Sequence, residues 1–552
     1  MDEVTEDFEN SDLENLVIKD KAYKRKQLIK ILIIILIIII ILLIIAIVVY
    51  FILKNNKNTY GEIVCVYQTI YNNENIVLIK NDEDLNFDLI INGIKFNQEY
   101  SHSFNNSGFQ NVTFVFKSRL KSLANLFDNN KALVEADLSK LNAEDIKSMN
   151  SLFFHCIKLR KVIFNFNTTN SIENMANLFF NCPLLTYVSF NFNAEKLKDL
   201  TGIFQKCERL SSIELNLFNT KNLQIMDKAF EECVYIKYID LSTLNFENLI
   251  SLNETFNYCE KLQDIKFPKT YTKELVYMVR TFLGCWKLET IDLNYFKTEK
   301  VKSMLYLFNS CYNLKEINIS HFKTDNLVYI EGMFSNCASL TSLDLSSFSF
   351  EKVTSFFSLF EGCQSLKKMD ISFAETPLLD TMYRTFMKCK KLEKVYLPKK
   401  LEYVRNVEKI FANCEKLEYV DLSPFNSSLI EKAGSMFANC YSLKIVEFPF
   451  IIGNFLLSSS NMFSNCTNLN SIDMGNFHTF ELNDLEYMFY NCKNLNYLDI
   501  SHLTIDFDSN LNEIFKGIIS NITVIVNKDI NPILKDEILK LNATLIETES
   551  DI

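Results

Sequence analysis

Histidine is scarce in this chain, and the groupings that catalysis or metal binding usually requires are missing. Five of the 552 residues are histidines, at non-equivalent positions: His102, His155, His321, His478 and His502. No nucleophile elbow or phosphate-binding loop accompanies them. Zinc sites need clustered ligands such as C-x-x-C, and the chain has none. We therefore predict that the protein is not an enzyme and has no cofactor and no metal site.

A surplus of basic residues is missing too. The chain has 57 Lys and Arg against 68 Asp and Glu, a formal net charge of −11. Proteins that bind nucleic acid need a positive patch or stripe, so we expect no nucleic-acid partner. Hydrophobic residues make up 48% of the chain and charged ones 23%, which is enough apolar material for a long buried core.

What the chain has is a regular series of cysteines. Fourteen of its fifteen cysteines follow one another at steps of 26 residues, two steps of 25 excepted. They are Cys156, Cys182, Cys207, Cys233, Cys259, Cys285, Cys311, Cys337, Cys363, Cys389, Cys414, Cys440, Cys466 and Cys492. A phenylalanine precedes each by three residues and also occurs one unit beyond either end, at Phe127 and Phe515. This periodicity predicts a repeat array of about sixteen units over residues 119–527.

One unit, residues 301–322, shows what each repeat contains. Apolar residues at steps of three and four (Val301, Met304, Leu307, Phe308 and Cys311) indicate a short helix or helix-like turn. Leu314, Ile317 and Ile319 then give the L-x-x-L-x-L spacing of a short parallel strand. We predict an α/β solenoid, a leucine-rich-repeat-like right-handed stack of coils in which neighbours bury one another's apolar faces.

The amino-terminal part contains an unbroken apolar run, Ile31 to Leu53, long enough to cross a bilayer. A buried core helix and a cleavable signal peptide are the alternatives, although the run is long for a signal peptide and mostly polar residues precede it. Six basic residues lie between 19 and 30, and only Lys54 and Lys57 follow closely. We predict a cytosolic tail over 1–27 and a signal anchor over 28–53 that contacts the lipid bilayer. The protein would then be a single-pass type II plasma-membrane protein.

Two smaller segments flank the array. Alternating apolar residues between 60 and 118, with an Asn92-Gly93 turn, predict a small antiparallel β domain as stalk and cap. Further degenerate repeats are the alternative, but the segment has no Phe-x-x-Cys. Residues 528–552 predict a carboxyl-terminal cap, with Asn531 and Pro532 opening a short helix to about Leu541.

The repeat resembles that of the BspA-like leucine-rich repeat surface proteins. The motif runs from Met333 through Phe334 and Cys337 to Leu340, followed by the strand Leu343-Asp344-Leu345-Ser346 and by Phe348. The resemblance implies a surface-exposed solenoid of microbes and single-celled eukaryotes, with roles in adhesion or in binding a host or matrix. The chain departs from the pattern in two ways. Threonine fills a usually aliphatic slot at Thr255, Thr281 and Thr385, and no cell-wall sorting signal appears at the carboxyl end.

The fourteen cysteines have three possible roles: disulfides, metal ligands or buried thiols. Stacking brings equivalent Cα atoms near disulfide range, but parallel side chains seldom reach the required Cβ separation and torsion. We therefore favour a column of free, buried thiols. Cys65 lies outside the column and has no evident partner.

A column of carboxylates is the candidate ligand-binding feature. Seven residues after the cysteine stand Glu214, Asp240, Asp292, Asp344, Asp370, Asp421, Glu447, Asp473 and Asp499. Alternation turns them away from the core, and the tyrosines Tyr187, Tyr238, Tyr396, Tyr419 and Tyr497 share that strand face. Either the column attracts a ligand, or each carboxylate accepts local hydrogen bonds from the residue two positions on. Lys266 and Tyr396 interrupt the column.

These features together predict a membrane-anchored surface protein whose extracellular solenoid binds a protein or matrix ligand. A receptor that signals through a partner and a structural surface coat are the alternatives. Sequons that would make it a glycoprotein in a eukaryotic cell stand at Asn105, Asn111, Asn167, Asn253, Asn318, Asn426, Asn465, Asn521 and Asn542.

Overall fold

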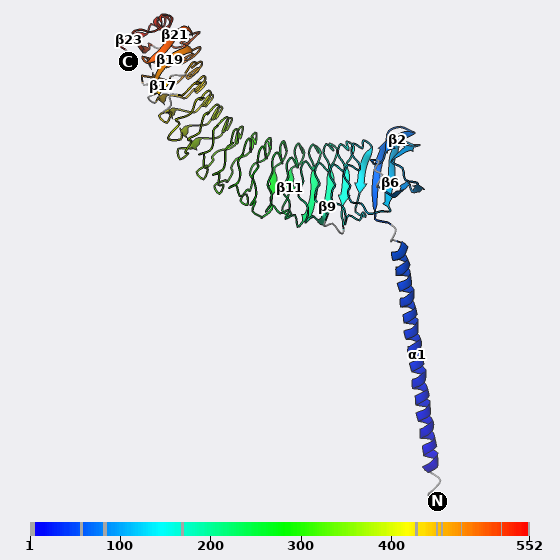
Figure 1. The fold of residues 1–552 in the computed structure, drawn as a ribbon. Helices are drawn as coiled ribbons and strands as arrows, with labels where there is room; N and C mark the ends of the chain where they lie inside the picture. The colour runs from blue at the N-terminus through cyan, green and yellow to red at the C-terminus, as the bar shows by residue number, and fades with distance from the viewer. Residues whose placement is uncertain are drawn as a thin grey trace.

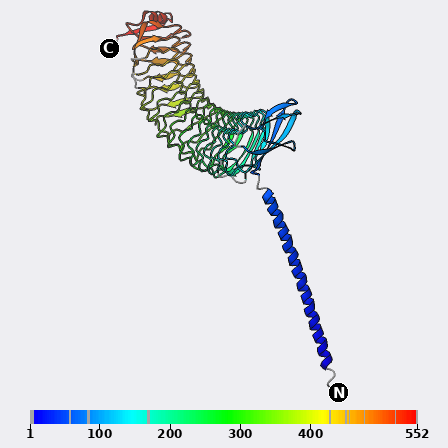
Figure 2. The same ribbon diagram turned by 45° about the vertical axis from the view of Figure 1, so that its right-hand side comes forward.

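The chain forms a long curved stack of coils with an extended helix at its amino-terminal end (Figure 1). The computed structural model describes residues 6–55, 59–80, 85–166, 171–425, 429–448, 451–453, 456–475, 477–519 and 521–549. A view turned by 45° shows that the stack bends along its length as one continuous ribbon (Figure 2). The predicted leucine-rich-repeat-like solenoid is thus confirmed.

Each coil bends on one side, here called the turn side, through two left-handed residues. In the coil of Cys311 these residues are Tyr306 and Ser310, with φ of 53° and 60°. A left-handed residue ends a right-handed helical path, so the turn side is a chain of tight turns and not a helix. In the described residues α-helix occurs only in α1 (Glu6–Asn55) and α2 (Pro532–Leu539). Of the helix and the helix-like turn that the spacing allowed, the structure has the turn.

Backbone N–H groups on the turn side alternate between two kinds of partner. The N–H of Leu307 donates within its own coil, to the carbonyl of Met304 at 3.1 Å. The N–H of Tyr306 donates to the carbonyl of Glu331 in the next coil, at 2.9 Å. Since a buried backbone group without a partner is costly, a coil on the turn side needs its neighbour for its own backbone to be satisfied.

A column of phenylalanine rings fills the core beneath these turns. From Phe127 to Phe515, rings of successive coils stack with centroids 5.2 to 6.1 Å apart. All of these rings are buried, and Phe308 and Phe334 have no exposed surface. The core is therefore one continuous column, and each coil contributes one layer to it.

The opposite side of each coil, the strand side, carries short parallel strands. The first four are β7 (Leu133–Asp137), β8 (Lys161–Phe164), β9 (Tyr187–Asn193) and β10 (Ser212–Phe218). Three pairs follow in which neighbours hydrogen-bond, β11 (Tyr238–Asp240) with β12 (Asp264–Lys266), β13 (Lys368–Asp370) with β14 (Lys394–Tyr396), and β15 (Tyr419–Asp421) with β16 (Ile445–Glu447). Within the described range 267–367 the equivalent positions hold no strand, so the strand side is less regular than the turn side.

At the amino-terminal end an antiparallel segment joins the solenoid sheet. β1 (Glu62–Thr69) pairs with β6 (Gly108–Phe116) on one side and with β7 of the first coil on the other. β3 (Phe87–Ile91) and β4 (Ile94–Phe96) form the predicted hairpin, with Asn92 and Gly93 at φ of 49° and 84°. β2 (Glu74–Val77) and β5 (Ser101–Phe104) form a separate pair. One eight-stranded sheet therefore runs from β4 to β10 without a break between cap and repeats.

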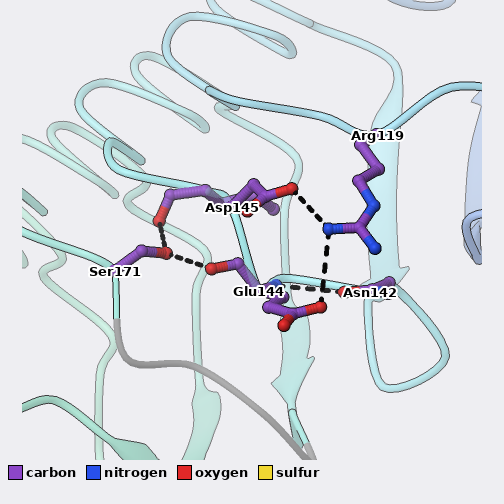
Figure 3. A network of polar contacts seen from close by, with 6 residues as sticks. Arg119, Asn142, Glu144, Asp145 and Ser171 are labelled. Atoms are coloured by element: carbon purple, nitrogen blue, oxygen red, sulfur yellow. Dashed lines mark hydrogen bonds and ion pairs between the residues drawn. The ribbon is translucent and has the colours of Figure 1, made fainter.

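Polar contacts on the surface tie the first coils together (Figure 3). The Arg119 guanidinium lies 2.9 Å from the carboxylate of Asp145 and 3.7 Å from that of Glu144, in the next coil. The hydroxyl of Ser171, one coil further on, donates at 2.7 Å to the carbonyl oxygens of Glu144 and Ile146. These groups are largely exposed, so the network contributes modestly to stability.

The carboxyl-terminal coils carry two parallel sheets. One contains β17 (Ile451–Gly453), β19 (Phe477–Asp484) and β21 (Leu503–Asn510). The other contains β18 (Ser471–Asp473), β20 (Tyr497–Asp499), β22 (Thr523–Asn527) and β23 (Thr544–Thr548), and the sequence reading did not foresee β23. Before it lies α2, where the Asn531 side chain accepts hydrogen bonds from two helix N–H groups, as the sequence predicted for this cap. Leu534 and Ile538 of α2 are buried against the end of the core.

Helix α1 contains a stretch with the length and composition of a membrane span. Residues Ile18–Tyr50 have a mean hydropathy of 4.2 over their most apolar window and are not buried by other parts of the structure. Thirty-three residues of α-helix are about 50 Å long at 1.5 Å per residue, more than the roughly 30 Å hydrocarbon core of a bilayer.

Candidate functional site

The cysteine column belongs to the core. All fifteen cysteines are free and buried. In the array each thiol donates to the carbonyl oxygen of a phenylalanine in the preceding coil, as Cys311 does to Phe282 at 3.2 Å. Burial raises the pKa of these thiols, that of Cys363 to about 12. A protonated, inaccessible thiol is neither a nucleophile nor a metal ligand, so the column serves packing.

The threonines that depart from the family pattern also lie in the core. Thr255, Thr281 and Thr385 have no exposed surface. Their hydroxyls donate to carbonyl oxygens of the preceding coil, each at 3.0 Å. Each threonine therefore satisfies its hydroxyl inside the stack, and the departure does not disturb the coil.

On the strand side the aspartates of the column are engaged in local turns. The carboxylate of Asp344 accepts from the N–H of Ser346 at 2.9 Å, and that of Asp421 from the N–H of Ser423 at 2.8 Å. The same bond, to the N–H two residues on, is made by Asp240, Asp292, Asp370, Asp473 and Asp499. Asn318 makes it without a charge, to Ser320 at 3.3 Å. The geometry therefore supports the local interpretation of the aspartates.

In four further coils the residue at this repeat position is not an aspartate and does not make this turn. Glu214 lies in the longer strand β10 and accepts from the hydroxyl of Ser189 at 3.0 Å. Lys266, Tyr396 and Glu447 are each followed two residues later by a proline, at 268, 398 and 449. Proline has no N–H to donate, so the aspartate turn cannot form in these three coils. Lys266 and Tyr396, which interrupt the carboxylate column, therefore lie in coils that lack this turn.

The five tyrosines of the strand side are unequally exposed. Tyr238, Tyr396 and Tyr419 expose 47%, 45% and 45% of their surface, while Tyr187 and Tyr497 are half-buried. Burial and a hydrogen bond to Glu447 raise the pKa of Tyr419 to about 12, so its hydroxyl stays protonated. Burial and the nearby carboxylates of Asp499 and Asp473 raise the pKa of Tyr497.

Two of these tyrosines line a hollow in the strand side. It has a volume of about 840 Å³ and lies between the coils of Cys363, Cys389 and Cys414. Its lining includes Tyr396, Tyr419 and Asp421 from the predicted set. It also includes three lysines that were not among the predicted site residues, Lys394, Lys399 and Lys416. The structure thus gathers three predicted residues at one place and leaves the others spread along the stack.

The sequence carried a signal for this hollow. The step from Cys389 to Cys414 is one of the two that have 25 residues, and Pro398 replaces the serine found at that place in neighbouring coils. Six lysines and one glutamate lie between 388 and 400, in a chain of net charge −11. A shortened coil, a proline and a local excess of lysine together mark the place where the repeat departs from its pattern.

The remaining candidate positions, those for a metal ion and for glycosylation, give less support for a functional site. In the part of the chain that the structure describes, no group of three or more His, Cys, Asp or Glu could hold a metal ion. Of the sequons, Asn465 belongs to a row of side-chain amides, donating to Asn439 and accepting from Asn491, each at 2.8 Å. Asn167 and Asn426 lie outside the described residues.

The fold and its exposed strand side define a leucine-rich-repeat solenoid of the kind that presents a surface for binding. A model described as "Mycoplasma protein of unknown function, DUF285" matches residues 94–212, 168–269 and 276–399, just over half of the chain. A model of the BspA type leucine-rich repeat region matches 381–520 and 459–536. The chain belongs to the family of the first model, and its carboxyl-terminal part carries repeats of the BspA type, which the motif resembled.

Similar solved structures share little sequence with the chain. A TLR13–ssRNA13 complex matches at 15% identity over 78% of this chain and 70% of that one (TM-score 0.24). The Toll–Spatzle complex of Drosophila matches at 16% over 72% and 48% (TM-score 0.24). The functional domain of InlJ from Listeria monocytogenes, described as including a cysteine ladder, matches at 15% over 69% and 72% (TM-score 0.21). No curated protein matches the chain.

Proposed function

We propose that the protein is a membrane-anchored surface protein that binds a protein or matrix ligand through the strand side of its solenoid. Residues 28–53 would be the anchor, 1–27 the cytosolic tail, 60–118 the stalk and cap, 119–527 the binding array and 528–552 the terminal cap. Leucine-rich repeats generally act as binding scaffolds, because a rigid stack presents an extended surface. Within this proposal adhesion or recognition is the activity, and no step of catalysis is involved.

The observation that carries the proposal is the pairing of exposed tyrosines with a hollow on a rigid face. Tyr238, Tyr396 and Tyr419 keep nearly half of their surface exposed although the rest of each coil is tightly packed. Tyrosine is enriched in protein interfaces because it supplies a large contact area and a polar tip. The column aspartates would shape this surface through their turns and would contact ligand only at its edges.

The test uses the full chain in lipid nanodiscs against immobilised matrix proteins and host-cell surfaces. We expect the double variant Tyr238→Ala/Tyr419→Ala to weaken binding on the order of tenfold, as loss of buried aromatic contacts does. The matched control is Tyr277→Ala/Tyr329→Ala, which removes two equally exposed tyrosines (46% and 52%) from the line of single-residue bridges outside the strands. Equal loss in both variants, or no binding by the unmodified chain, would contradict a ligand-binding strand side.

The proposed topology has its own test. Basic residues before the apolar run of α1 favour a cytosolic amino terminus. Protease added to intact cells should therefore digest an epitope placed after residue 549 and spare one placed at residue 1. Protection of the carboxyl-terminal epitope would place the array inside the cell. Recruitment of cytosolic proteins by the tail would favour the receptor alternative, and ordered self-assembly of purified chains the coat alternative.

A further inference from the structure

The hollow between the coils of Cys363 and Cys414 has a composition unlike the rest of the surface. The coil that forms its floor is one residue short, and Tyr396 and Pro398 stand where neighbouring coils have aspartate and serine. β14 pairs with β13, and β15 pairs with β16, but in the described residues no pairing joins β14 to β15. The gap in the sheet therefore coincides with the hollow.

The unpaired charges in the hollow are mostly positive. Lys394, Lys399 and Lys416 are exposed, and none of them has an ion-pair partner among the described residues. Of the acids in the lining, Glu418 pairs with Lys444 at 2.9 Å and Asp421 accepts from the Ser423 N–H. Glu393 and Asp421 remain to offset the three lysines, because a hydrogen bond to a backbone N–H leaves the Asp421 carboxylate charged. Unpaired lysines attract an anionic ligand, whereas the excess of acids in the rest of the chain repels one, so any attraction is confined to the hollow.

The aromatic residues of the hollow are partly engaged by neighbouring side chains. One face of the Tyr396 ring is covered by the ammonium of Lys368, 4.9 Å from the ring centroid. The hydroxyl of Tyr419 is held by Glu447. The remaining exposed surface of both rings and the lysine stems is left for packing, together with the half-buried Pro424. Lysine is a point charge on a flexible stem, so three of them can follow carboxylates at varied spacing along a peptide.

We propose that this hollow binds an acidic segment of a protein partner. Lys394, Lys399 and Lys416 pair with its carboxylates, while Tyr396 and Tyr419 pack against its side chains. The inference rests on the proposed function, since it names the chemistry of the partner that the strand side receives.

The experiment uses the full chain in nanodiscs and three fluorescent probes: a polyglutamate peptide of about ten residues, the polyglutamine peptide of equal length, and heparin as a sulfated polysaccharide. We expect binding of polyglutamate, none of polyglutamine, and a marked loss of affinity between about 0.1 M and 1 M salt, where the screening length falls from about 10 Å to 3 Å. Polyglutamate and heparin separate an acidic peptide from a sulfated glycan.

The variant Lys394→Glu/Lys399→Glu should weaken polyglutamate binding at least about tenfold, since two attractive charges become repulsive. Lys287→Glu/Lys302→Glu is the matched control, because both lysines are exposed and have no ion pair among the described residues. It should change affinity less than about twofold. Unfolding curves of the two variants should coincide, which separates lost binding from lost structure.

Three outcomes would overturn the inference: binding of heparin but not polyglutamate, binding of neither, or equal losses in both lysine variants. Its failure is distinguishable from failure of the proposed function. If the lysine variant keeps full binding to matrix or cells while the strand-side tyrosine variant loses it, the inference falls and the proposed function stands. If the chain binds polyglutamate through the hollow but binds no matrix or cell surface, the inference stands without the wider proposal.

Discussion

The turn side and the strand side of the same coils differ in how strictly they repeat. On the turn side every coil from Cys156 to Cys492 has the same stacked ring, thiol bond and pair of left-handed residues, as the coil of Cys311 shows with Phe308, Tyr306 and Ser310. On the strand side coils alternate between aspartate turns, longer strands and proline-containing loops. The contacts that hold neighbouring coils together therefore lie mainly on the turn side. The strand side can vary in shape and charge without breaking them.

The largest expected effect concerns the thiol column and alkaline pH. Burial raises the pKa of the fourteen array thiols above the unfolded value, as it does for Cys156 and Cys440, both to about 12 from 9.0. Below pH 9 both states are protonated and stability is unaffected. Above pH 9 only the unfolded chain releases thiol protons, so stability falls until the folded pKa is reached. Each thiol contributes about 1.4 kcal/mol per pH unit, and many act together.

Circular dichroism between pH 7 and 11 should therefore show a steep alkaline unfolding transition. Because lysine and tyrosine also titrate there, the variant Cys311→Ala/Cys337→Ala provides the discriminating measurement. Its unfolding free energy should fall less steeply with pH than that of the unmodified chain, by about 3 kcal/mol per unit for two groups. An unchanged slope would remove the thiols from the explanation.

The second prediction breaks the ring column at one layer. Phe308→Ala should destabilise the stack by about 3–5 kcal/mol, since it leaves a cavity between two stacked neighbours. Urea unfolding measures the loss. The strand-side change Tyr238→Ala, at a ring that is 47% exposed, should cost far less. Equal costs for the two variants would show that cohesion is shared by both sides.

The third prediction concerns the left-handed residues. Gly332 has φ of 59°, and a Cβ there would overlap the ring of Tyr306. Gly332→Ala should cost about 1–3 kcal/mol from strain and overlap. Asn336→Gly, at φ of 60° in the same coil, should change the unfolding free energy by only a few tenths of a kcal/mol. Thermal unfolding of both variants compares the two, and a harmless Gly332→Ala would contradict the turn geometry.

The smallest effect is expected in the aspartate column. Asp344→Asn keeps an acceptor for the Ser346 N–H and should change stability by less than about 0.5 kcal/mol at pH 7. Asp344→Ala removes the acceptor and should cost about 1 kcal/mol. The Ser346 N–H and hydroxyl lower the pKa of Asp344, so its carboxylate stabilises the fold above the unfolded pKa and loses that effect on acidification. An Asn variant as damaged as the Ala variant would show that the charge itself matters.

Much of this architecture could be predicted because the repeat is written directly in residue spacing. The Phe-x-x-Cys interval, the Asn92-Gly93 hairpin and the Asn531 cap each rest on local chemistry that a single segment contains. The backbone structure of the turn side was harder to predict, because apolar residues at steps of three and four fit both a helix and a turn. The frequent Asn and Gly just before the cysteine, as at Asn336 and Gly362, were the available signal for left-handed backbone.

The short coil, Pro398 and the local lysines mark this coil as unusual, but the hollow itself could not be predicted because it depends on what three successive coils leave unfilled. Tyr396 and the aspartates share one position in the repeat, and only the structure shows that the aspartates are bound in turns while Tyr396 lines the hollow. Likewise β1 reads as part of a separate segment, yet it pairs with β7 and continues the solenoid sheet. A pairing between distant segments leaves no mark in the spacing of either one.

The amino-acid sequence by itself determined the repeat, the apolar helix and the family, because periodicity and long apolar runs act within one segment and need no knowledge of neighbours. The tertiary structure alone decided which exposed groups are free to bind. That depends on whether a neighbouring coil supplies a partner. Lys444 of the next coil pairs with Glu418, whereas none of the described residues forms an ion pair with Lys394.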